Sequence, residues 1–167
     1  MMMKASIEVR PATEADLRAI FLIYADAVQH TTAIWNETVG DLGDRKVWFL
    51  DRTGKGFPVL VAEADGVLGY GSFGDFRPFH GYRVTVEHSI YVDKGSRGNG
   101  AGAMLMEALI AEARRMGKRN MIGAIDASNA PSLSLHKRFG FAEVGRLPGV
   151  GEKFGKILDL VLMQKVL

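Results

Sequence analysis

Apolar residues recur at helical spacing in several segments of the chain, and each such segment predicts a helix. The clearest helix spans about 100–116 and is followed by Gly117, which stands where a left-handed C-cap belongs. Its apolar stripe consists of Met104, Leu105, Ala108, Leu109 and Ala113. Earlier and later helices are predicted at 13–28, 41–53 and 129–139. On the helix at 41–53 we expect Val47, Trp48, Phe49 and Leu50 to contribute to the core.

Alternating or uniformly apolar runs between these helices predict the strands of a sheet. The strands are expected at 6–10, 57–64, 67–76, 85–92, 120–125, 141–147 and 157–166. Asp65-Gly66 is a hairpin signal between two of them, and the glycine-rich segment 148–155 is expected to be a loop between the last two. The polar or turn-rich segments 77–83 and 93–99 are also expected to be loops.

The mixed order of these elements predicts an α/β or α+β fold built on a single sheet. Only the segment 85–125 has the strand–helix–strand order of a crossover, so parallel pairing should be confined to one place. The chain has 167 residues, and we find no internal repeat, low-complexity tract or linker. We therefore expect one domain over residues 1–167.

Composition and charge exclude several classes of function. Lys and Arg exceed Asp and Glu by a net +2, which predicts no dedicated nucleic-acid surface. The lack of cysteine excludes disulfides and cysteine chemistry, and it fits a reducing, cytoplasmic compartment. No apolar run is long enough for a membrane helix, so we expect no membrane partner. His30 and His80 lack partners at metal-ligand spacing, so we assign no metal. Met1–Met3 leave the start codon open.

The glycine-rich turn before the clearest helix is the strongest chemical signal. In Arg97-Gly98-Asn99-Gly100-Ala101-Gly102, alternate glycines let successive N–H groups converge on an anion at the helix N-terminus, and a diphosphate suits such a cradle. A flexible loop is the structural alternative. A dinucleotide-binding turn is another, because Gly98-x-Gly100-x-x-Ala103 and a later Asp126 fit its relaxed pattern. Against it, residues 93–97 separate the strand from the glycines, and further parallel crossovers are missing.

At these residues the chain resembles the GNAT acyltransferase superfamily, whose phosphate loop reads Arg/Gln-x-x-Gly-x-Gly/Ala. The likeness is to one branch, the phosphinothricin and methionine sulfoximine or methionine sulfone acetyltransferases. Residues 97–102 match the loop pattern in full. The stretches shared with the branch are Thr31-Thr32-Ala33-Ile34-Trp35-Asn36-Glu37, Gly74-Asp75-Phe76-Arg77-Pro78-Phe79, Thr85-Val86-Glu87-His88-Ser89, Leu135-His136 and Val150-Gly151-Glu152-Lys153-Phe154-Gly155.

The resemblance implies the GNAT fold, a mixed and mostly antiparallel twisted sheet flanked by helices. It implies acetyl-CoA as donor, direct transfer to the α-amino group of a small amino acid analogue, and a homodimer. The implied cofactor residues are Ile90, Tyr91 and Val92 for pantetheine, Arg97, Gly98, Asn99, Gly100, Ala101, Gly102 and Ala103 for the diphosphate, and Asn129 for the pantetheine arm. The implied substrate residues are Arg77, Pro78, Phe79, Glu87, His88 and Ser89.

The residues themselves suggest roles for three of these side chains. An α-amino group with a pKa of roughly 7.7–8.0 must lose a proton before it attacks, and Glu87 is our candidate base. His136 occupies the helix position at which many GNAT members carry Tyr, and it is either a proton donor, a helper of the base or a packed histidine. Arg77 can bind a substrate carboxylate through its planar fork, or it is an ordinary surface arginine.

Two alternatives to an amino acid acetyltransferase stay open. Another amine, such as a peptide N-terminus or a polyamine, would be a different acceptor, although a polyamine needs an acidic lining that the Arg77 region does not offer. A module that binds CoA without catalysis is the non-enzymatic alternative, and Glu87 and His136 argue against it. The sequence does not rank phosphinothricin, methionine sulfoximine, methionine sulfone or an ordinary amino acid as acceptor.

Overall fold

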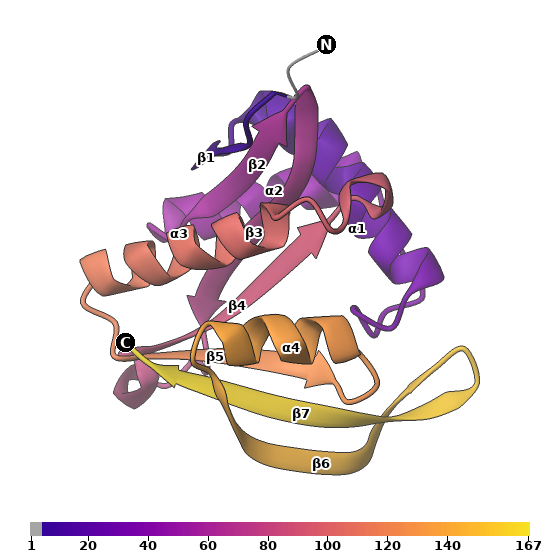
Figure 1. The fold of residues 1–167 in the computed structure, drawn as a ribbon, viewed down its shortest axis with the longest axis vertical. Helices are drawn as coiled ribbons and strands as arrows, with labels where there is room; N and C mark the ends of the chain where they lie inside the picture. The colour runs from indigo at the N-terminus through magenta and orange to yellow at the C-terminus, as the bar shows by residue number, and fades with distance from the viewer. Residues whose placement is uncertain (1–4) are drawn as a thin grey trace.

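A computed structural model describes residues 5–167, and the question about Met1–Met3 lies outside these residues. Within the described part, one seven-stranded sheet has the order β1-β2-β3-β4-β5-β7-β6 (Figure 1). The strands are β1 (Glu8–Pro11), β2 (Val59–Ala64), β3 (Gly66–Asp75), β4 (Thr85–Val92), β5 (Asn120–Asp126), β6 (Ala142–Lys153) and β7 (Lys156–Val166). The helices are α1 (Leu17–His30), α2 (Leu42–Gly54), α3 (Ala101–Arg115) and α4 (Ala130–Arg138), with short 3₁₀ turns η1 (Glu14–Asp16), η2 (His80–Tyr82) and η3 (Lys94–Ser96).

The pairing of the strands confirms the predicted mixed, mostly antiparallel sheet. Among the described strands β4 and β5 are the parallel neighbours, and α3 is the helix that connects them. A parallel pair needs such a crossover, whereas β2 and β3 are joined by the predicted turn at Asp65. Across residues 5–167, no helix has both the length and the apolar character needed to cross a bilayer.

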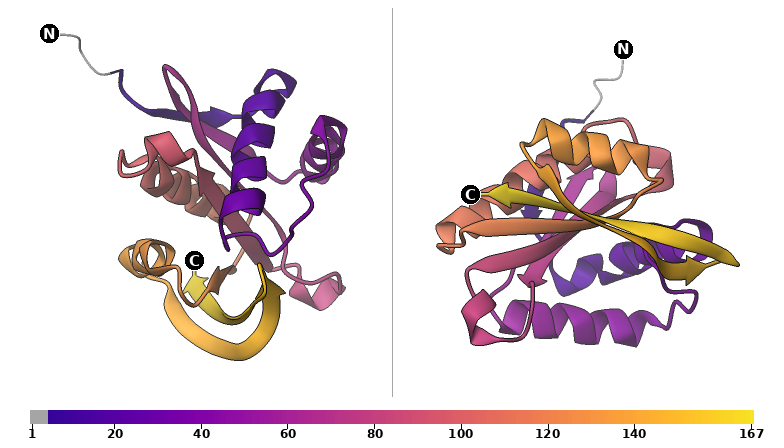
Figure 2. Two further views of the ribbon diagram at one scale, coloured as in Figure 1. Left: turned by 90° about the vertical axis from the view of Figure 1, so that its right-hand side faces the viewer. Right: turned by 90° about the horizontal axis from the view of Figure 1, so that it is seen from below.

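The sheet separates two hydrophobic cores. Helices α1 and α2 cover one face, and α3 and α4 cover the other (Figure 2). Fully buried Leu105 and Met106 of α3 pack with Phe73 on one face, and Ile20 of α1 packs with Tyr70 on the other. Strand β3 supplies both cores because successive side chains of a strand point to opposite faces.

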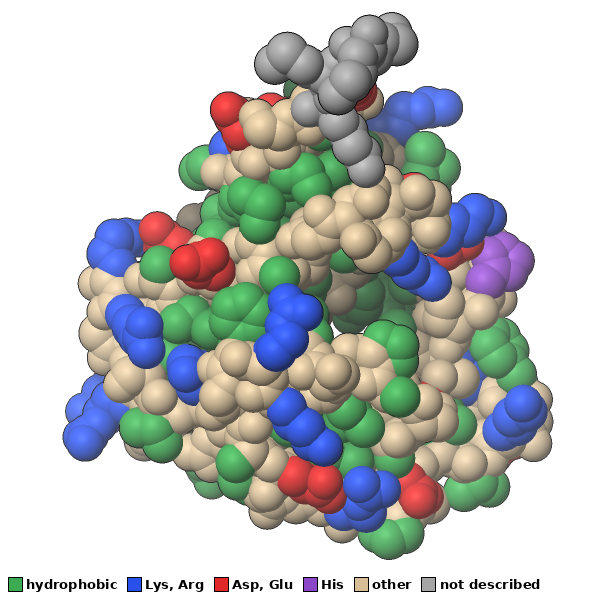
Figure 3. Space-filling model, viewed as in Figure 1, with side chains coloured by type: hydrophobic (Ala, Val, Ile, Leu, Met, Phe, Trp, Pro, Cys, Tyr) green, Lys and Arg blue, Asp and Glu red, His purple; other side chains and the backbone are tan. Residues whose placement is uncertain are grey.

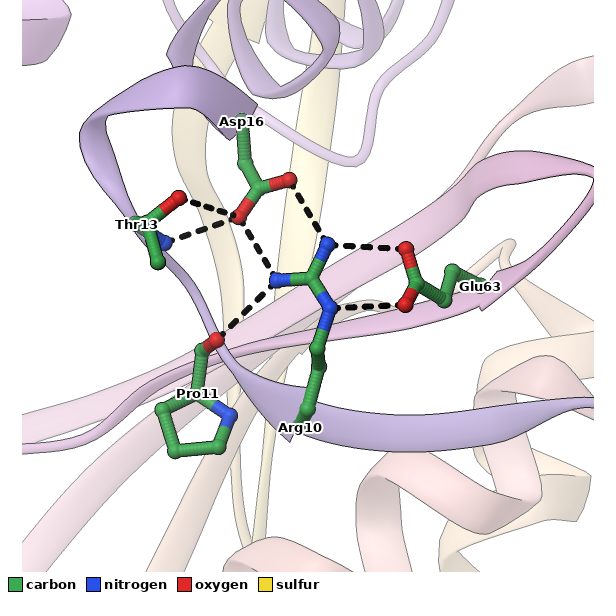
Figure 4. A network of polar contacts seen from close by, with 5 residues as sticks. All are labelled: Arg10, Pro11, Thr13, Asp16 and Glu63. Carbon is green, nitrogen blue, oxygen red and sulfur yellow. Dashed lines mark hydrogen bonds and ion pairs between the residues drawn. The ribbon is translucent and has the colours of Figure 1, made fainter.

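Arg10 joins three elements at the edge of the sheet (Figure 4). Its Nε and Nη2 atoms donate to the two carboxylate oxygens of Glu63 on β2, at 2.7 and 2.8 Å. Its Nη1 and Nη2 atoms donate to Asp16, at 2.8 and 3.0 Å, and Asp16 in turn accepts the backbone N–H of Thr13. The bonds from Arg10 lower the pKa of both carboxyl groups. Strand β1 is thereby fixed to β2 and to the start of α1.

Two predictions about local structure are wrong. The segment 148–155 is mostly not a loop, because β6 continues through it to Lys153 with register shifts at 143–145 and 147–151. An edge strand tolerates glycine and Pro148 at such irregular points. On α2, Val47 and Leu50 are 69% and 48% exposed, whereas Phe49 is buried. The helix therefore contacts the sheet along a narrower stripe than its sequence suggests.

Candidate active site

A wedge opens in the sheet between β4 and β5. The two strands pair only from Thr85 to Glu87 with Asn120 to Ile122. Beyond these residues β4 still pairs with β3 as far as Val92, and β5 still pairs with β7 as far as Asp126, but the two strands separate from each other (Figure 1). The inner edge of β4 over 88–92 therefore has backbone groups that no neighbouring strand takes up. An extended ligand can pair with such an edge as an added strand.

A cleft of about 1010 Å³ occupies this wedge. Figure 3 shows the surface hollowed between α3 and α4, with Lys and Arg side chains beside the hollow. The predicted site residues that line the cleft are His88, Ser89, Ile90, Tyr91, Val92, Arg97, Gly98, Gly100, Ala101, Gly102, Ala103, Asn129 and His136. Those that lie outside its lining are Asn99, Glu87, Arg77, Pro78 and Phe79. The fold thus gathers most of the predicted cofactor residues on one concave surface.

The glycine-rich turn forms the N-terminus of α3 at the rim of the cleft. Gly98 and Gly100 have φ angles of 79° and 90°, a left-handed conformation that residues with a side chain rarely adopt. Gly100 is the N-cap of α3, and a Cβ there would find no protein atom within 4 Å. The first N–H groups of a helix have no intrahelical partner. Those of α3 start directly in the cleft, as an anion site requires.

Asn129 has a structural bond as well as a place in the cleft. Its Oδ1 accepts the backbone N–H of Ser132 at 3.2 Å, so Asn129 caps α4. Its side-chain NH₂ group makes no hydrogen bond among the described residues, and it can donate to a ligand in the cleft. Arg97, by contrast, is 56% exposed and lies 4.0 Å from Asp26 of α1.

Two buried histidines meet where the wedge begins. His88 Nε2 and His136 Nε2 are 3.0 Å apart, and His136 Nδ1 is 2.7 Å from the carbonyl oxygen of Ser132. That oxygen can only accept, so Nδ1 of His136 carries a proton and donates it. The Nε2 of neutral His136 is then a bare lone pair, which accepts the Nε2–H of His88. His88 Nδ1 is left as a buried acceptor without a partner in residues 5–167.

Burial keeps this histidine pair neutral. It lowers the pKa of His88 to about 3, with a smaller contribution from His136, and it also lowers the pKa of His136. Both nitrogens of His136 are engaged, one by Ser132 and one by His88. In this arrangement His136 has no free N–H to give to a leaving group.

Gly123 on β5 makes the histidine pair possible, and sequence reasoning missed it. A Cβ at this position would lie 2.7 Å from His136 Nε2 and 3.3 Å from His88 Nε2. Any other residue would therefore push the imidazoles apart. A glycine inside an apolar strand was the available signal, because such a glycine often marks a close approach of other groups.

Glu87 lies on the other side of the sheet from the histidine pair. Successive residues of β4 alternate, so His88 points toward α3 and α4 and Glu87 toward α1 and α2. Burial raises the pKa of Glu87, while the charges of Arg52 and Arg77 oppose that rise. The structure therefore brings Glu87 together with two arginines and separates it from His136.

The predicted substrate residues at 77–79 belong to an exposed loop between β3 and η2. Phe79 is 71% exposed, and the Arg77 guanidinium lies 5.3 Å from the centre of the Phe76 ring. This loop lies outside the lining of the large cleft. Arg77 is nevertheless close enough to Glu87 for its positive charge to oppose the rise in the pKa of that carboxyl group.

Lys153 anchors the loop after α1, which forms one wall of the cleft, and our sequence analysis assigns no role to this lysine. Its buried Nζ donates to the carbonyl oxygens of Val28 and Thr31, both at 2.6 Å, and to that of Ile34. These bonds tie the end of α1 and the loop after it to the β6–β7 hairpin. The shared stretch at 150–155 contained this residue, but its contacts depend on chain segments about 120 positions away.

The dinucleotide-binding alternative does not fit the structure. The turn η3 separates β4 from the glycines, and the sheet has a single parallel pair among its described strands. Asp126 is occupied within the protein, because its carboxylate accepts the hydroxyl of Thr32 and the backbone N–H of Ser128.

A mixed sheet whose parallel strands β4 and β5 separate, with a helix that begins in a glycine-rich turn beside the gap, defines the class of acyl-CoA-dependent N-acyltransferases. The chain belongs to the acetyltransferase (GNAT) family, whose model matches residues 19–141.

Three similar proteins narrow this membership. The L-methionine sulfoximine/L-methionine sulfone acetyltransferase of Pseudomonas aeruginosa is 53% identical over 161 residues, which are 95% of this chain and 94% of that protein. A structure described as ribosomal-protein-alanine N-acetyltransferase from Brucella melitensis has a TM-score of 0.94 and 52% identity, and covers 96% of this chain and 99% of its own. The yncA acetyltransferase from Salmonella typhimurium, solved with its cofactor acetyl-CoA, has a TM-score of 0.94 and 47% identity, with coverages of 97% and 94%. The expected GNAT fold and acetyltransferase branch are thereby confirmed.

Proposed function

We propose that this protein transfers the acetyl group of acetyl-CoA to the α-amino group of a small amino acid analogue of the methionine sulfoximine, methionine sulfone or phosphinothricin type. The observation that carries the proposal is the unpaired edge of β4 beside the N-terminus of α3, inside one cleft. The relatives at about 50% identity support the acceptor class. The whole chain, residues 1–167, would act as a single domain.

The proposed donor site follows from the backbone of the wedge. Pantetheine would pair with Ile90, Tyr91 and Val92 as a short added strand. The free NH₂ group of Asn129 would donate a hydrogen bond to the same pantetheine arm. The N–H groups of residues 98–103 would bind the diphosphate, aided by the positive end of the α3 dipole. Arg97 would add a contact from the rim, where it is partly exposed.

In the proposed reaction the acceptor nitrogen attacks the thioester carbonyl in a ternary complex. A C–N bond forms, the C–S bond breaks, and the amine proton passes to Glu87, directly or through a water molecule. The raised pKa of Glu87 suits this task, because the carboxylate accepts a proton more readily than an exposed one would. A backbone N–H of the 90–92 edge would stabilise the oxyanion, a contribution of about 3 kcal/mol for one such donor.

The hydrogen bonds of His136 support a role in positioning its neighbour His88 rather than a role as proton donor. His136 accepts the N–H of His88 and donates to Ser132, so it holds His88 at the start of the wedge. The thiolate of CoA leaves with a moderate pKa and can take its proton from water. Ser89 and the loop residues Pro78 and Phe79 would then complete the acceptor side that Glu87 faces.

A peptide N-terminus is a second acceptor worth testing, because of the likeness to the Brucella melitensis structure. It differs from a free amino acid in size and in having no carboxylate next to the amine. A panel of methionine sulfone, methionine sulfoximine, phosphinothricin, a standard amino acid and an N-terminal alanine peptide would be read by release of free thiol. Faster release from the peptide than from every amino acid analogue would overturn the proposed acceptor.

We also propose a homodimer in the cytoplasm. Val144, Leu147, Val150 and Ile157 on β6 and β7 are exposed apolar residues, which would suit contact with a second copy of the chain. The cysteine-free sequence suits a reducing compartment. Light scattering after size-exclusion chromatography would measure the mass, and a mass of 18.2 kDa at all concentrations would reject the dimer.

A further inference from the structure

Arg52 of α2 occupies a space that Gly74 leaves empty. Gly74 is buried on β3, and a Cβ there would overlap Nη1 of Arg52 and lie 2.9 Å from its Cζ. The guanidinium therefore rests directly on the backbone of β3. Arg52 itself is half-buried, and the ring centre of Trp48 lies 5.9 Å from its Cζ.

The strand register places this guanidinium beside the candidate base. Gly74 is paired with Glu87 across β3 and β4. Residues directly opposite each other in an antiparallel pair carry their side chains on the same face, with Cβ atoms about 4.5–5.5 Å apart. Arg52 thus takes the place of the missing cross-strand neighbour of Glu87. The two groups still do not form an ion pair, since no nitrogen of Arg52 lies within 4.0 Å of a carboxylate oxygen in residues 5–167.

Arg52 also makes no side-chain hydrogen bond within the described chain, although a guanidinium carries five N–H donors. Burial lowers its pKa, and the nearby carboxylates Asp51, Asp75 and Glu87 counter this only from a distance. A half-buried cation without a partner is costly unless water or a ligand supplies acceptors. Its planar fork matches a carboxylate in two parallel bonds.

We propose that Arg52 binds the α-carboxylate of the acceptor while Glu87 receives the proton of its α-amino group. This inference rests on the proposed function. An amino acid carries its amine and carboxylate on one carbon, and this site offers one acidic and one basic group side by side. Arg77, exposed on its loop, would then contact the outer part of the acceptor. The same guanidinium would repel amines that lack a carboxylate, such as polyamines.

The test compares L-methionine sulfone with its amide, which keeps the amine and loses the charge. Arg52→Gln should raise KM for the acid about 10- to 100-fold, the loss expected for charge-assisted bonds, and change KM for the amide less than about threefold. The amide has a different amine pKa, but this difference cancels when each variant is compared with the unaltered protein. Lys46→Ala is the matched control, because it removes one cation from an exposed ion pair on the same helix.

Gly74→Ala provides an independent variant that leaves Arg52 in the chain. The added methyl group should displace the guanidinium and raise KM for the acid alone, by less than Arg52→Gln does. Affinity for acetyl-CoA, measured by calorimetry, should stay within about twofold in both variants and shows that they are folded. If Arg52→Gln fails to fold, Gly74→Ala decides the question.

The outcomes separate this inference from the function on which it rests. Equal losses for acid and amide, or an unchanged KM for the acid, would overturn the role of Arg52. Loss of the preference for the acid in Arg77→Ala but not in Arg52→Gln would assign the carboxylate to Arg77 and overturn it as well. If the unaltered protein binds acetyl-CoA and releases no thiol with any amine, the proposed function itself is wrong.

Discussion

Arg10 and Arg52 show how differently one residue type serves two regions of the same sheet. Arg10 at the β1–β2 edge binds two carboxylates and a backbone carbonyl, and its fork is fully used within the chain (Figure 4). Arg52 at the β3–β4 side is half-buried and has no hydrogen bond or ion pair among residues 5–167. Arg10 therefore stabilises the edge of the sheet, whereas the N–H donors of Arg52 are free to bind a ligand, as we propose for the acceptor carboxylate.

The same contrast holds for the strands around them. The β1–β2 and β2–β3 pairs are continuous, whereas β4 and β5 part after three residue pairs. Satisfied groups add to stability, but unsatisfied groups in a cleft are where a ligand gains most. We therefore expect substitutions in the closed region to change stability, and substitutions in the open region to change binding and turnover.

The largest effect is expected at Gly100, in the open region. Gly100→Phe should weaken acetyl-CoA binding more than about 100-fold, because a side chain at a φ of 90° would both strain the turn and fill the cleft. Isothermal titration with acetyl-CoA measures this. Glu107→Gln, at an exposed position of the same helix outside the lining of the cleft, is the control and should bind almost normally. Tight binding by Gly100→Phe would contradict the diphosphate site.

Glu87→Gln should lower kcat about 100- to 1,000-fold and leave acetyl-CoA affinity nearly unchanged. Because burial raises the pKa of Glu87, the acid limb of kcat/KM should lie above the ordinary range of a glutamate. Activity should rise as pH rises through that pKa, since the base must be ionised. Stopped-assay thiol release over pH 4–9 tests both points, and an unaltered acid limb in the variant would remove Glu87 from the mechanism.

Arg10→Gln should change stability and leave the kinetics unaltered, whereas Arg52→Gln should change KM. The Arg10 variant should lower Tm by a few degrees, because Glu63 and Asp16 lose their common partner, and leave KM and kcat unchanged. Differential scanning calorimetry measures Tm, and the thiol-release assay measures KM and kcat. A kinetic defect as large as that of Arg52→Gln would show that the division between a closed and an open region is wrong.

The effect expected from the histidine pair concerns stability rather than turnover, and it depends on pH. An unfolded histidine binds a proton near pH 6.5, whereas folded His88 binds one only near pH 3. Between these values the unfolded state holds more protons, so stability falls as pH falls, by at most about 1.4 kcal/mol per pH unit. His88→Gln keeps an N–H donor toward His136 and should flatten this slope. Urea unfolding measures the free energy of unfolding of both proteins from pH 7 to 4. The same dependence on pH in both proteins would contradict a buried, neutral His88.

Much of the fold could be predicted from local pattern. The strand at 85–92 and the helix before Gly117 were visible because the apolar spacing and the turn residues agree there. The prediction of a loop at 148–155 is wrong, since glycine and proline signal a loop while pairing with β7 keeps the segment in a strand. The prediction of a buried Leu50 is wrong because periodicity shows that a helix has an apolar face, but not how much of that face is covered.

The glycine turn, the acidic residue on β4 and the family that they imply could be recognised in the chain before any folding was considered, because such features are local and keep their spacing. The partners across the sheet, in contrast, became apparent in the folded chain. The fold placed Arg52 in the gap of Gly74 beside Glu87, seated His136 against His88 over Gly123, and bound Lys153 to the end of α1. These contacts join residues between 13 and 125 positions apart, and it is the register of the strands and the packing of the helices that bring them together.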